Sequence, residues 1–235
     1  MDKAGLINAQ AIIVHDDLDL LSTAVAQRIE ALAAQAIAAR GVFHIALTGG
    51  ETPRRCYDKL RYLDIDWPHV QIYFGDERCV PDEDAQRNDK MAHDTLLAHV
   101  PIPSENIHPI PAELGAQEAA ARYAPVLERI ARLDLTLLGM GEDGHIASLF
   151  PGNPATGSST TVVPVFNSPK PPAERVSLGM STLNESRQKI FLVAGAGKRT
   201  ALEQIMRGVA LPAARITDAE WHLDRAAWPS DQPIK

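Results

Sequence analysis

One histidine of the chain lies in a glycine-rich segment beside a carboxylate. Segment 139–152 reads GMGEDGHIASLFPG, and its Asp143 stands two residues before His145. An imidazole with a pKa near 6.5 is largely neutral at neutral pH, so it can take a proton from water. We therefore expect His145 to act as a general base, oriented by Asp143 or by Asp76. Taken alone, the same histidine is also consistent with a structural role inside a tight loop.

Other segments combine groups that suit an anion. The sequence TGGETP begins at Thr48 and joins Gly49 and Gly50 to the start of a helix, where free N–H groups and the positive helix end favour a phosphate. Arg78 can bind an oxyanion through two nitrogens, and Lys198 adds a mobile positive charge. Each segment alone is equally consistent with an ordinary turn or with exposed, unpaired charges.

Three secondary candidates are Glu77, Lys170 and Arg175. Lys170 lies within the proline-rich stretch PKPP and Arg175 follows it, and such a stretch is also typical of a rigid connector. Their positive charges can assist at a phosphate, and Glu77 adjoins two of the main candidates.

Several known site motifs are absent or incomplete. The GMGEDG segment has dinucleotide-type glycines, but Pro151 comes too early for a long helix and no acidic residue follows roughly 20 positions later. The GAGK segment has Leu192 where a P-loop needs its first glycine and Arg199 where it needs Ser or Thr. Neither a GxSxG elbow nor an HExxH helix occurs. These gaps argue against a nicotinamide cofactor, ATP hydrolysis, a serine nucleophile and a zinc mechanism.

Composition indicates a protein of the cytoplasm that has neither nucleic acid nor a membrane as its main partner. The chain has 235 residues, with 23 basic and 30 acidic side chains and a formal charge of -7. This balance argues against nucleic acid or an anionic membrane as partner. No run approaches the roughly 20 apolar residues of a membrane span, and MDKAGLINAQ lacks signal-peptide features. Cys56 and Cys79 are expected to be reduced. The oligomeric state stays open.

Strand patterns and helix patterns alternate along the chain. A helix is predicted from Leu18, capped by Asp16 or Asp17 and closed by Gly41, and another follows Thr52 as N-cap with Pro53 as its first residue. Further helices are predicted over 88–100, 117–132 and 199–206, strands over 42–47, 70–74, 133–139, 175–180, 189–195 and 221–228, and a long loop over 75–87.

Such alternation predicts one three-layer α/β domain, residues 1–235, with a mostly parallel central sheet covered on both faces. Ligands of such sheets bind outside the carboxyl ends of the strands. The loops that begin at Thr48, Gly75, Gly139 and Gly195 each follow a predicted strand. Their shared edge is the predicted active site.

The ordered motifs resemble those of the 6-phosphogluconolactonase family over nearly the whole chain. They are TGGETP (48–53), GDERCVP (75–81), GMGEDGHIASLFPG (139–152), SPKPPAERVSL (168–178) and GAGK (195–198). The resemblance implies the fold of glucosamine-6-phosphate deaminases, no cofactor, and hydrolysis of 6-phosphoglucono-1,5-lactone to 6-phosphogluconate in the pentose phosphate pathway.

By this resemblance the family's histidine is His145, its companion carboxylate Asp143, its arginine Arg78 and its late-loop lysine Lys198. The family's asparagine matches Asn88, which is expected near the phosphate. Two positions depart from the family pattern. Glu51 stands where a small polar residue is common, and Arg87 where serine usually precedes the asparagine.

Two other functions remain open. An amino-sugar phosphate isomerase or deaminase shares the GxDGH loop, but its loop continues to a catalytic glutamate, where this chain has Phe150. Phenylalanine cannot transfer a proton. A non-catalytic sugar-phosphate sensor should carry a DNA-binding segment, whereas here the first strand and helix are expected to begin close to Met1.

Overall fold

The computed structural model describes residues 12–229. The prediction that the first ten residues lack signal-peptide features falls outside this range. The strands are β1 (Ile12–His15), β2 (Phe43–Leu47), β3 (Val70–Phe74), β4 (Asp76–Arg78), β5 (Leu135–Leu138), β6 (Val162–Val165), β7 (Arg175–Leu178), β8 (Gln188–Val193) and β9 (Glu220–Asp224). The helices are α1 (Leu18–Arg40), α2 (Glu51–Leu60), α3 (Asn88–Thr95), α4 (Ala116–Glu128), α5 (Met180–Glu185) and α6 (Arg199–Met206).

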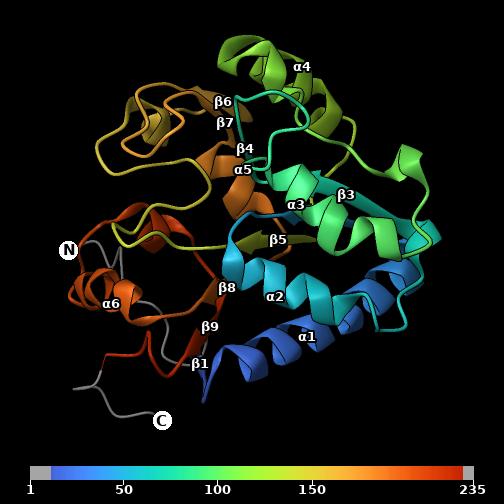
Figure 1. The fold of residues 1–235 in the computed structure, drawn as a ribbon, viewed down its shortest axis with the longest axis horizontal. Helices are drawn as coiled ribbons and strands as arrows, with labels where there is room; N and C mark the ends of the chain where they lie inside the picture. Colours follow the sequence, from blue (N-terminus) through green and yellow to red (C-terminus); the bar gives the residue numbers. More distant parts are fainter. Residues whose placement is uncertain (1–11, 230–235) are drawn as a thin grey trace.

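Six strands form a central parallel sheet in the order β1-β9-β8-β5-β2-β3. Helices flank this sheet, and α1 lies beside α2 along it (Figure 1). The predicted α/β class is therefore confirmed. Because the neighbouring strands β8, β5, β2 and β3 run in one direction, the loops that follow them emerge at the same edge of the sheet.

Local sequence accounts for the main elements. All four residues of β5 are buried, as expected for a strand covered on both faces. Helix α1 begins at the predicted cap, where the Asp17 carboxylate accepts the N–H of Leu20 at 2.9 Å, and it ends at Gly41 with φ 77°. Among the described residues, no helix combines the length and the apolar character needed to cross a bilayer.

A second, antiparallel sheet was not predicted. Strand β7 pairs with both β4 and β6, and α4 packs against β6 and β7 (Figure 1). The prediction of a continuous loop over 75–87 was wrong at its start, because β4 occupies three of its residues. So short a strand has no recognisable alternation, and its pairing with β7 is decided by packing.

Two predicted helix boundaries were also wrong. Gly50, with φ 112°, precedes the first residue of α2, so the helix begins before Thr52 and has no side-chain cap. Helix α3 ends at Thr95, and a separate 3-10 turn (Leu97–His99) follows it. Leu96, between the two, is completely buried and leaves the helical conformation with φ -128° and ψ -60°. No glycine or proline marks that point.

The buried His222, which stacks on the partly buried His15, is expected to make stability depend on pH. His15 and His222 stack across β1 and β9 with a 3.0 Å Nε2···Nδ1 contact, near Glu220 and Arg28. Burial and the charge of His15 lower the pKa of His222 to about 4. The unfolded chain, with a histidine pKa near 6.5, therefore binds the extra proton first as the pH falls.

We expect the free energy of unfolding to fall by up to about 3 kcal/mol between pH 6.5 and pH 4 because of His222. Urea denaturation of the wild type and of His222→Gln at pH 7.5 and pH 5 measures this effect. The variant should lose much of the pH dependence, whereas His69→Gln, at an exposed site, should keep it. Equal pH dependence in all three proteins would contradict the assignment.

Candidate active site

A cavity of about 560 Å³ lies at the predicted edge of the parallel sheet. Most of the predicted site residues line it: Thr48, Gly49, Gly50, Asp76, Arg78, Asn88, His145, Lys170, Arg175 and Lys198. Two do not. Asp143 does not line the cavity but is hydrogen-bonded to His145, which does. Glu77 is fully buried, between the cavity-lining residues Asp76 and Arg78. The four loops that end neighbouring strands thus come together as expected.

His145 and Asp143 form a close pair. The Nδ1 of His145 lies 2.5 Å from Oδ1 of Asp143, and the ring packs at 4.4 Å from that of Phe150. Burial lowers the pKa of His145, and the carboxylate of Asp143 opposes this shift. Burial of Asp143 is outweighed by its hydrogen bond to His145, so its pKa is also lowered. An ionised carboxylate only accepts, so Nδ1 carries the proton and Nε2 keeps its lone pair.

The loop leaves no room for a side chain beside this pair. A Cβ atom on Gly141 would lie 2.0 Å from Nδ1 of His145. Gly144 has φ 77°, which an L-residue adopts only with strain. The glycines of the GxDGH motif therefore set the position of the imidazole.

Asp76 is not the hydrogen-bond partner of His145. Its Oδ2 accepts the hydroxyl of Ser148 at 2.6 Å, and its Oδ1 accepts the side-chain amide of Asn88 at 3.1 Å. Ser148 was missed by sequence reasoning, although it lies three residues after His145 in the same motif. Its bond joins the β3–β4 segment to the histidine loop, so the buried carboxylate of Asp76 is held at the cavity wall.

The first glycine loop is anchored from α2. The Tyr57 hydroxyl accepts the N–H of Thr48 at 3.0 Å and donates to its carbonyl at 2.8 Å. A Cβ on Gly49 would lie 1.8 Å from Oδ1 of Asn88, so only glycine permits this close approach. Helix α2 has no side-chain cap, so the backbone N–H groups of its first two residues, Glu51 and Thr52, receive no acceptor from a capping side chain.

Two of the cationic candidates, Arg78 and Lys198, keep donors for a ligand. The Nε of Arg78 is buried without a hydrogen-bond partner, while its Nη1 donates to the carbonyl of Gln86. Burial lowers the pKa of Lys198, and Glu142 opposes this shift. Asp224, at the end of β9, accepts the N–H of Gly195 at 3.0 Å and so holds the loop that carries Lys198. Sequence reasoning missed Asp224.

Most of the hydrogen bonds of the Arg175 guanidinium go to carbonyl groups of the proline-rich turn. Its Nη2 donates to the carbonyls of Lys170 at 3.1 Å and Pro171 at 2.9 Å, and its Nε to that of Pro172 at 3.2 Å. These hydrogen bonds fix the turn that places Lys170 at the cavity. The stretch is therefore both an ordered connector and part of the cavity wall.

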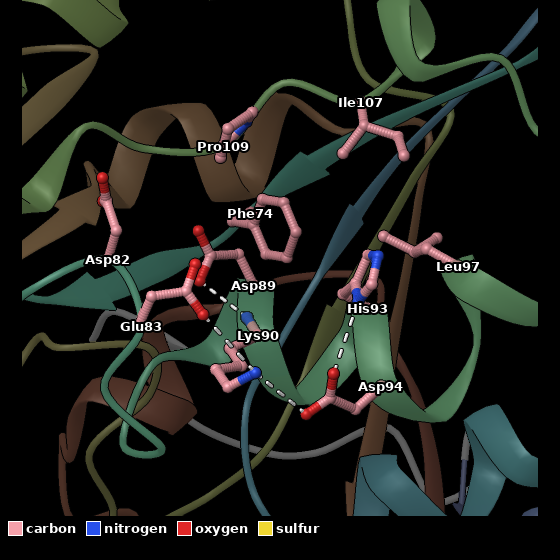
Figure 2. Close-up of a pocket in the computed structure, with 10 residues that line it drawn as sticks. All are labelled: Phe74, Asp82, Glu83, Asp89, Lys90, His93, Asp94, Leu97, Ile107 and Pro109. Carbon is pink, nitrogen blue, oxygen red and sulfur yellow. Dashed lines mark hydrogen bonds and ion pairs between the residues drawn. The ribbon is translucent and has the colours of Figure 1, made fainter.

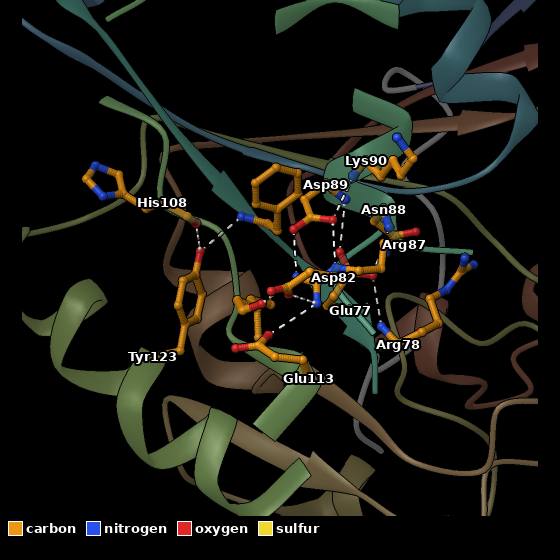
Figure 3. A network of polar contacts seen from close by, with 12 residues as sticks. Glu77, Arg78, Asp82, Arg87, Asn88, Asp89, Lys90, His108, Glu113 and Tyr123 are labelled. Carbon is orange, nitrogen blue, oxygen red and sulfur yellow. Dashed lines mark hydrogen bonds and ion pairs between the residues drawn. The ribbon is translucent and has the colours of Figure 1, made fainter. Parts of the chain in front are cut away.

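Of the two departures from the family pattern, Glu51 lies at the cavity wall, whereas Arg87 does not line the cavity. The carboxylate of Glu51 pairs with Arg54 and Arg55 on the surface of α2. Arg87 is 2% exposed and its guanidinium binds Asp89, as shown in Figure 3. It also contacts the carboxylates of Asp82 and Glu113 and the carbonyl of Ile110. Arg87 is thus a buried structural residue.

A second cavity, of about 340 Å³, lies beside α3 (Figure 2). Phe74, Leu97 and Ile107 form its apolar part, and its carboxylates pair with neighbouring basic groups. None of the predicted site residues lines it. Within residues 12–229, no group of three or more His, Cys, Asp or Glu side chains is arranged to hold a metal ion.

Comparison with known proteins shows the family of the chain. Residues 16–228 match the family model of glucosamine-6-phosphate isomerases/6-phosphogluconolactonase. A 6-phosphogluconolactonase of Mycobacterium tuberculosis is 40% identical over 243 aligned positions, covering 93% of this chain and 97% of that protein. The 6-phosphogluconolactonase structure from Thermotoga maritima superposes with a TM-score of 0.85 at 27% identity, covering 92% and 99% of the two chains.

The structure of a monomeric glucosamine-6-phosphate deaminase has a TM-score of 0.80 at 20% identity, covering 92% of this chain and 98% of that one. At this identity the likeness shows the shared fold alone. The match of the family model over most of the chain, together with the 40% identical relative, shows the family. The chain belongs to the glucosamine-6-phosphate isomerase and 6-phosphogluconolactonase family.

Proposed function

We propose that this protein is an enzyme that hydrolyses 6-phosphoglucono-1,5-lactone to 6-phosphogluconate, in the pentose phosphate pathway. The observation that carries the proposal is the Asp143–His145 pair, which faces a cavity lined by Arg78, Lys170 and Lys198. A base and a cluster of cations within one cavity suit a phosphorylated substrate that water attacks. The 6-phosphogluconolactonase of M. tuberculosis supports the same substrate.

In the proposed mechanism, Nε2 of His145 takes a proton from a water molecule as its oxygen bonds to the lactone carbonyl carbon. Asp143 holds the ring by its Nδ1–H and stabilises the imidazolium that forms. The tetrahedral intermediate then breaks its bond to the ring oxygen, which receives the proton from His145. The product is the open-chain acid. No metal and no organic cofactor take part in this scheme.

The phosphate is proposed to bind where the first glycine loop and the cationic side chains line the cavity. Gly49 and Gly50 supply the backbone at the start of α2, and Arg78 and Lys198 supply charge. Lys170, held by Arg175, assists. Against a chain of net charge -7, this local cluster accounts for binding of an anionic substrate. We further propose a cytoplasmic location, with neither nucleic acid nor a membrane as partner.

We expect the wild type to hydrolyse freshly prepared 6-phosphogluconolactone well above its spontaneous rate. Unphosphorylated gluconolactone should react at least about tenfold more slowly at equal low concentration, because the cationic groups then have no partner. Both rates follow from acid release in a weakly buffered assay with an enzyme-free control. Absence of hydrolysis of the phosphorylated lactone would refute the proposal.

Amino-sugar phosphate deamination is the second candidate, because the fold is shared with a deaminase. Phe150 is fully buried and packs on His145, at the place where the sequence comparison expects a catalytic glutamate. An aromatic ring offers no proton for opening a sugar ring. Ammonia release from glucosamine 6-phosphate, measured in the same preparation, would favour this second function.

A further inference from the structure

Glu77 is a buried carboxylate outside the cavity. It is 0% exposed, and its two oxygens accept three backbone N–H groups, as Figure 3 shows for its surroundings. Oε1 accepts from Arg78 at 2.9 Å and from Asn88 at 2.8 Å, and Oε2 accepts from Asp89 at 2.9 Å. Two of these donors are the first residues of α3.

Arg87 occupies the capping position of α3 but offers no side-chain acceptor, and its guanidinium binds Asp89 and other carboxylates. Oδ1 of Asp89 accepts the N–H of Lys90 at 2.6 Å, whereas the N–H groups of Asn88 and Asp89 are bound by Glu77. Glu77 therefore provides from β4, eleven residues earlier than Asn88, the acceptor that a helix normally receives from its own N-cap residue. The negative charge also suits the positive end of the helix.

Asn88 links this cap to the cavity. Its Nδ2 donates to the carbonyl of Asp76 at 2.8 Å and to Oδ1 of Asp76 at 3.1 Å, and its Oδ1 packs on Gly49. Ser148 holds the other oxygen of Asp76. The position of the Asp76 carboxylate at the cavity wall thus depends on where α3 begins.

A charge at this depth is costly to maintain. Burial and the charge of Asp89 raise the pKa of Glu77 to about 7, and the three N–H donors oppose that shift. An apolar side chain would fill the same space without this desolvation cost. An apolar residue could not accept the three backbone hydrogen bonds that the Glu77 carboxylate accepts.

We propose that Glu77 is a positioning residue for the proposed hydrolysis. It fixes the first residues of α3, so that Asn88 holds Asp76 ready to accept hydroxyl groups of the sugar. This inference rests on the proposed function for its kinetic part, whereas the arrangement of Glu77 and Asn88 is testable without any substrate.

The kinetic test replaces Glu77 by glutamine, which keeps the size but presents an amide N–H₂ to one of the donors. We expect kcat/KM for the phosphorylated lactone, per folded molecule, to fall about tenfold, since one charge-assisted hydrogen bond network is lost. The control is Glu113→Gln, because Glu113 binds the same Arg87 but no N–H of α3. It should stay within about twofold of the wild type. A lower melting temperature with unchanged kcat and KM in Glu77→Gln would overturn the proposal.

A double variant tests whether Glu77 acts through Asp76. If it does, Glu77→Gln combined with Asp76→Asn should be within about twofold of Asp76→Asn alone, because the second change removes nothing further. If the loss of kcat/KM in the double variant equals the product of the losses in the two single variants, Glu77 acts on catalysis independently of Asp76, and the proposal fails.

NMR spectroscopy separates this proposal from the proposed function. Glu77→Gln should shift the side-chain amide resonances of Asn88 and speed hydrogen exchange at the backbone N–H groups of Asn88 and Asp89, while Glu113→Gln should leave them unchanged. If Glu77→Gln does not fold, Glu77→Asp, shorter by one methylene, takes its place. Unmoved Asn88 resonances overturn the positioning role even in an active enzyme. Shifted resonances in a protein without lactonase activity support the arrangement and refute only the proposed function.

Discussion

Substitution of His145 by alanine is expected to lower kcat/KM for 6-phosphogluconolactone by about 10²-fold or more, because the proposed base is removed while the cavity remains. Hydrolysis is measured with folded protein and corrected for spontaneous opening. His69→Ala, which removes an exposed histidine bonded only to Asp66, serves as the matched control and should be fully active. Full activity of His145→Ala would show that His145 is not the base.

The pH dependence of the wild type checks the same assignment. A base works when unprotonated, and burial lowers the pKa of His145. The acid limb of kcat/KM should therefore lie below pH 6.5, with a plateau at neutral pH. Asp143 opposes the shift, so Asp143→Asn should move the limb to still lower pH and also reduce the plateau, since an amide favours the wrong tautomer. An acid limb that moves upward in Asp143→Asn would contradict this scheme.

Lys198→Ala is expected to raise KM for the phosphorylated lactone by about tenfold or more with little change in kcat. The lysine contributes charge to phosphate binding, and a binding contribution equal in ground and transition states appears in KM. Kinetics with unphosphorylated gluconolactone should be the same in the variant and the wild type. The control for a general loss of charge is Lys59→Ala. Lys59 lies near the C-terminal end of α2 and pairs with Asp19 of α1. An unchanged KM would remove Lys198 from the site.

The sequence by itself determined the parts of the site that depend on local order. Asp143 and His145 stand two residues apart in a loop whose glycines permit a tight turn, so their contact needs no distant partner. The buried strands before Thr48 and Gly139 are recognisable from short apolar runs. Once these strands are taken as parallel, their loops must share an edge, and the cavity residues follow.

Tertiary structure alone decided which distant groups meet. The sequence makes Asp76 a second candidate to orient His145, yet its oxygens accept hydrogen bonds from Asn88 and from Ser148, which is 72 residues away, and not from His145. Arg175 donates hydrogen bonds to the turn that carries Lys170, and Glu77 of β4 caps helix α3. These contacts depend on the register of β4 against β7 and on the docking of α3. No local sequence pattern predicts these contacts. The hydrogen-bond partners of a buried charged group depend on which elements pack beside it in the folded chain.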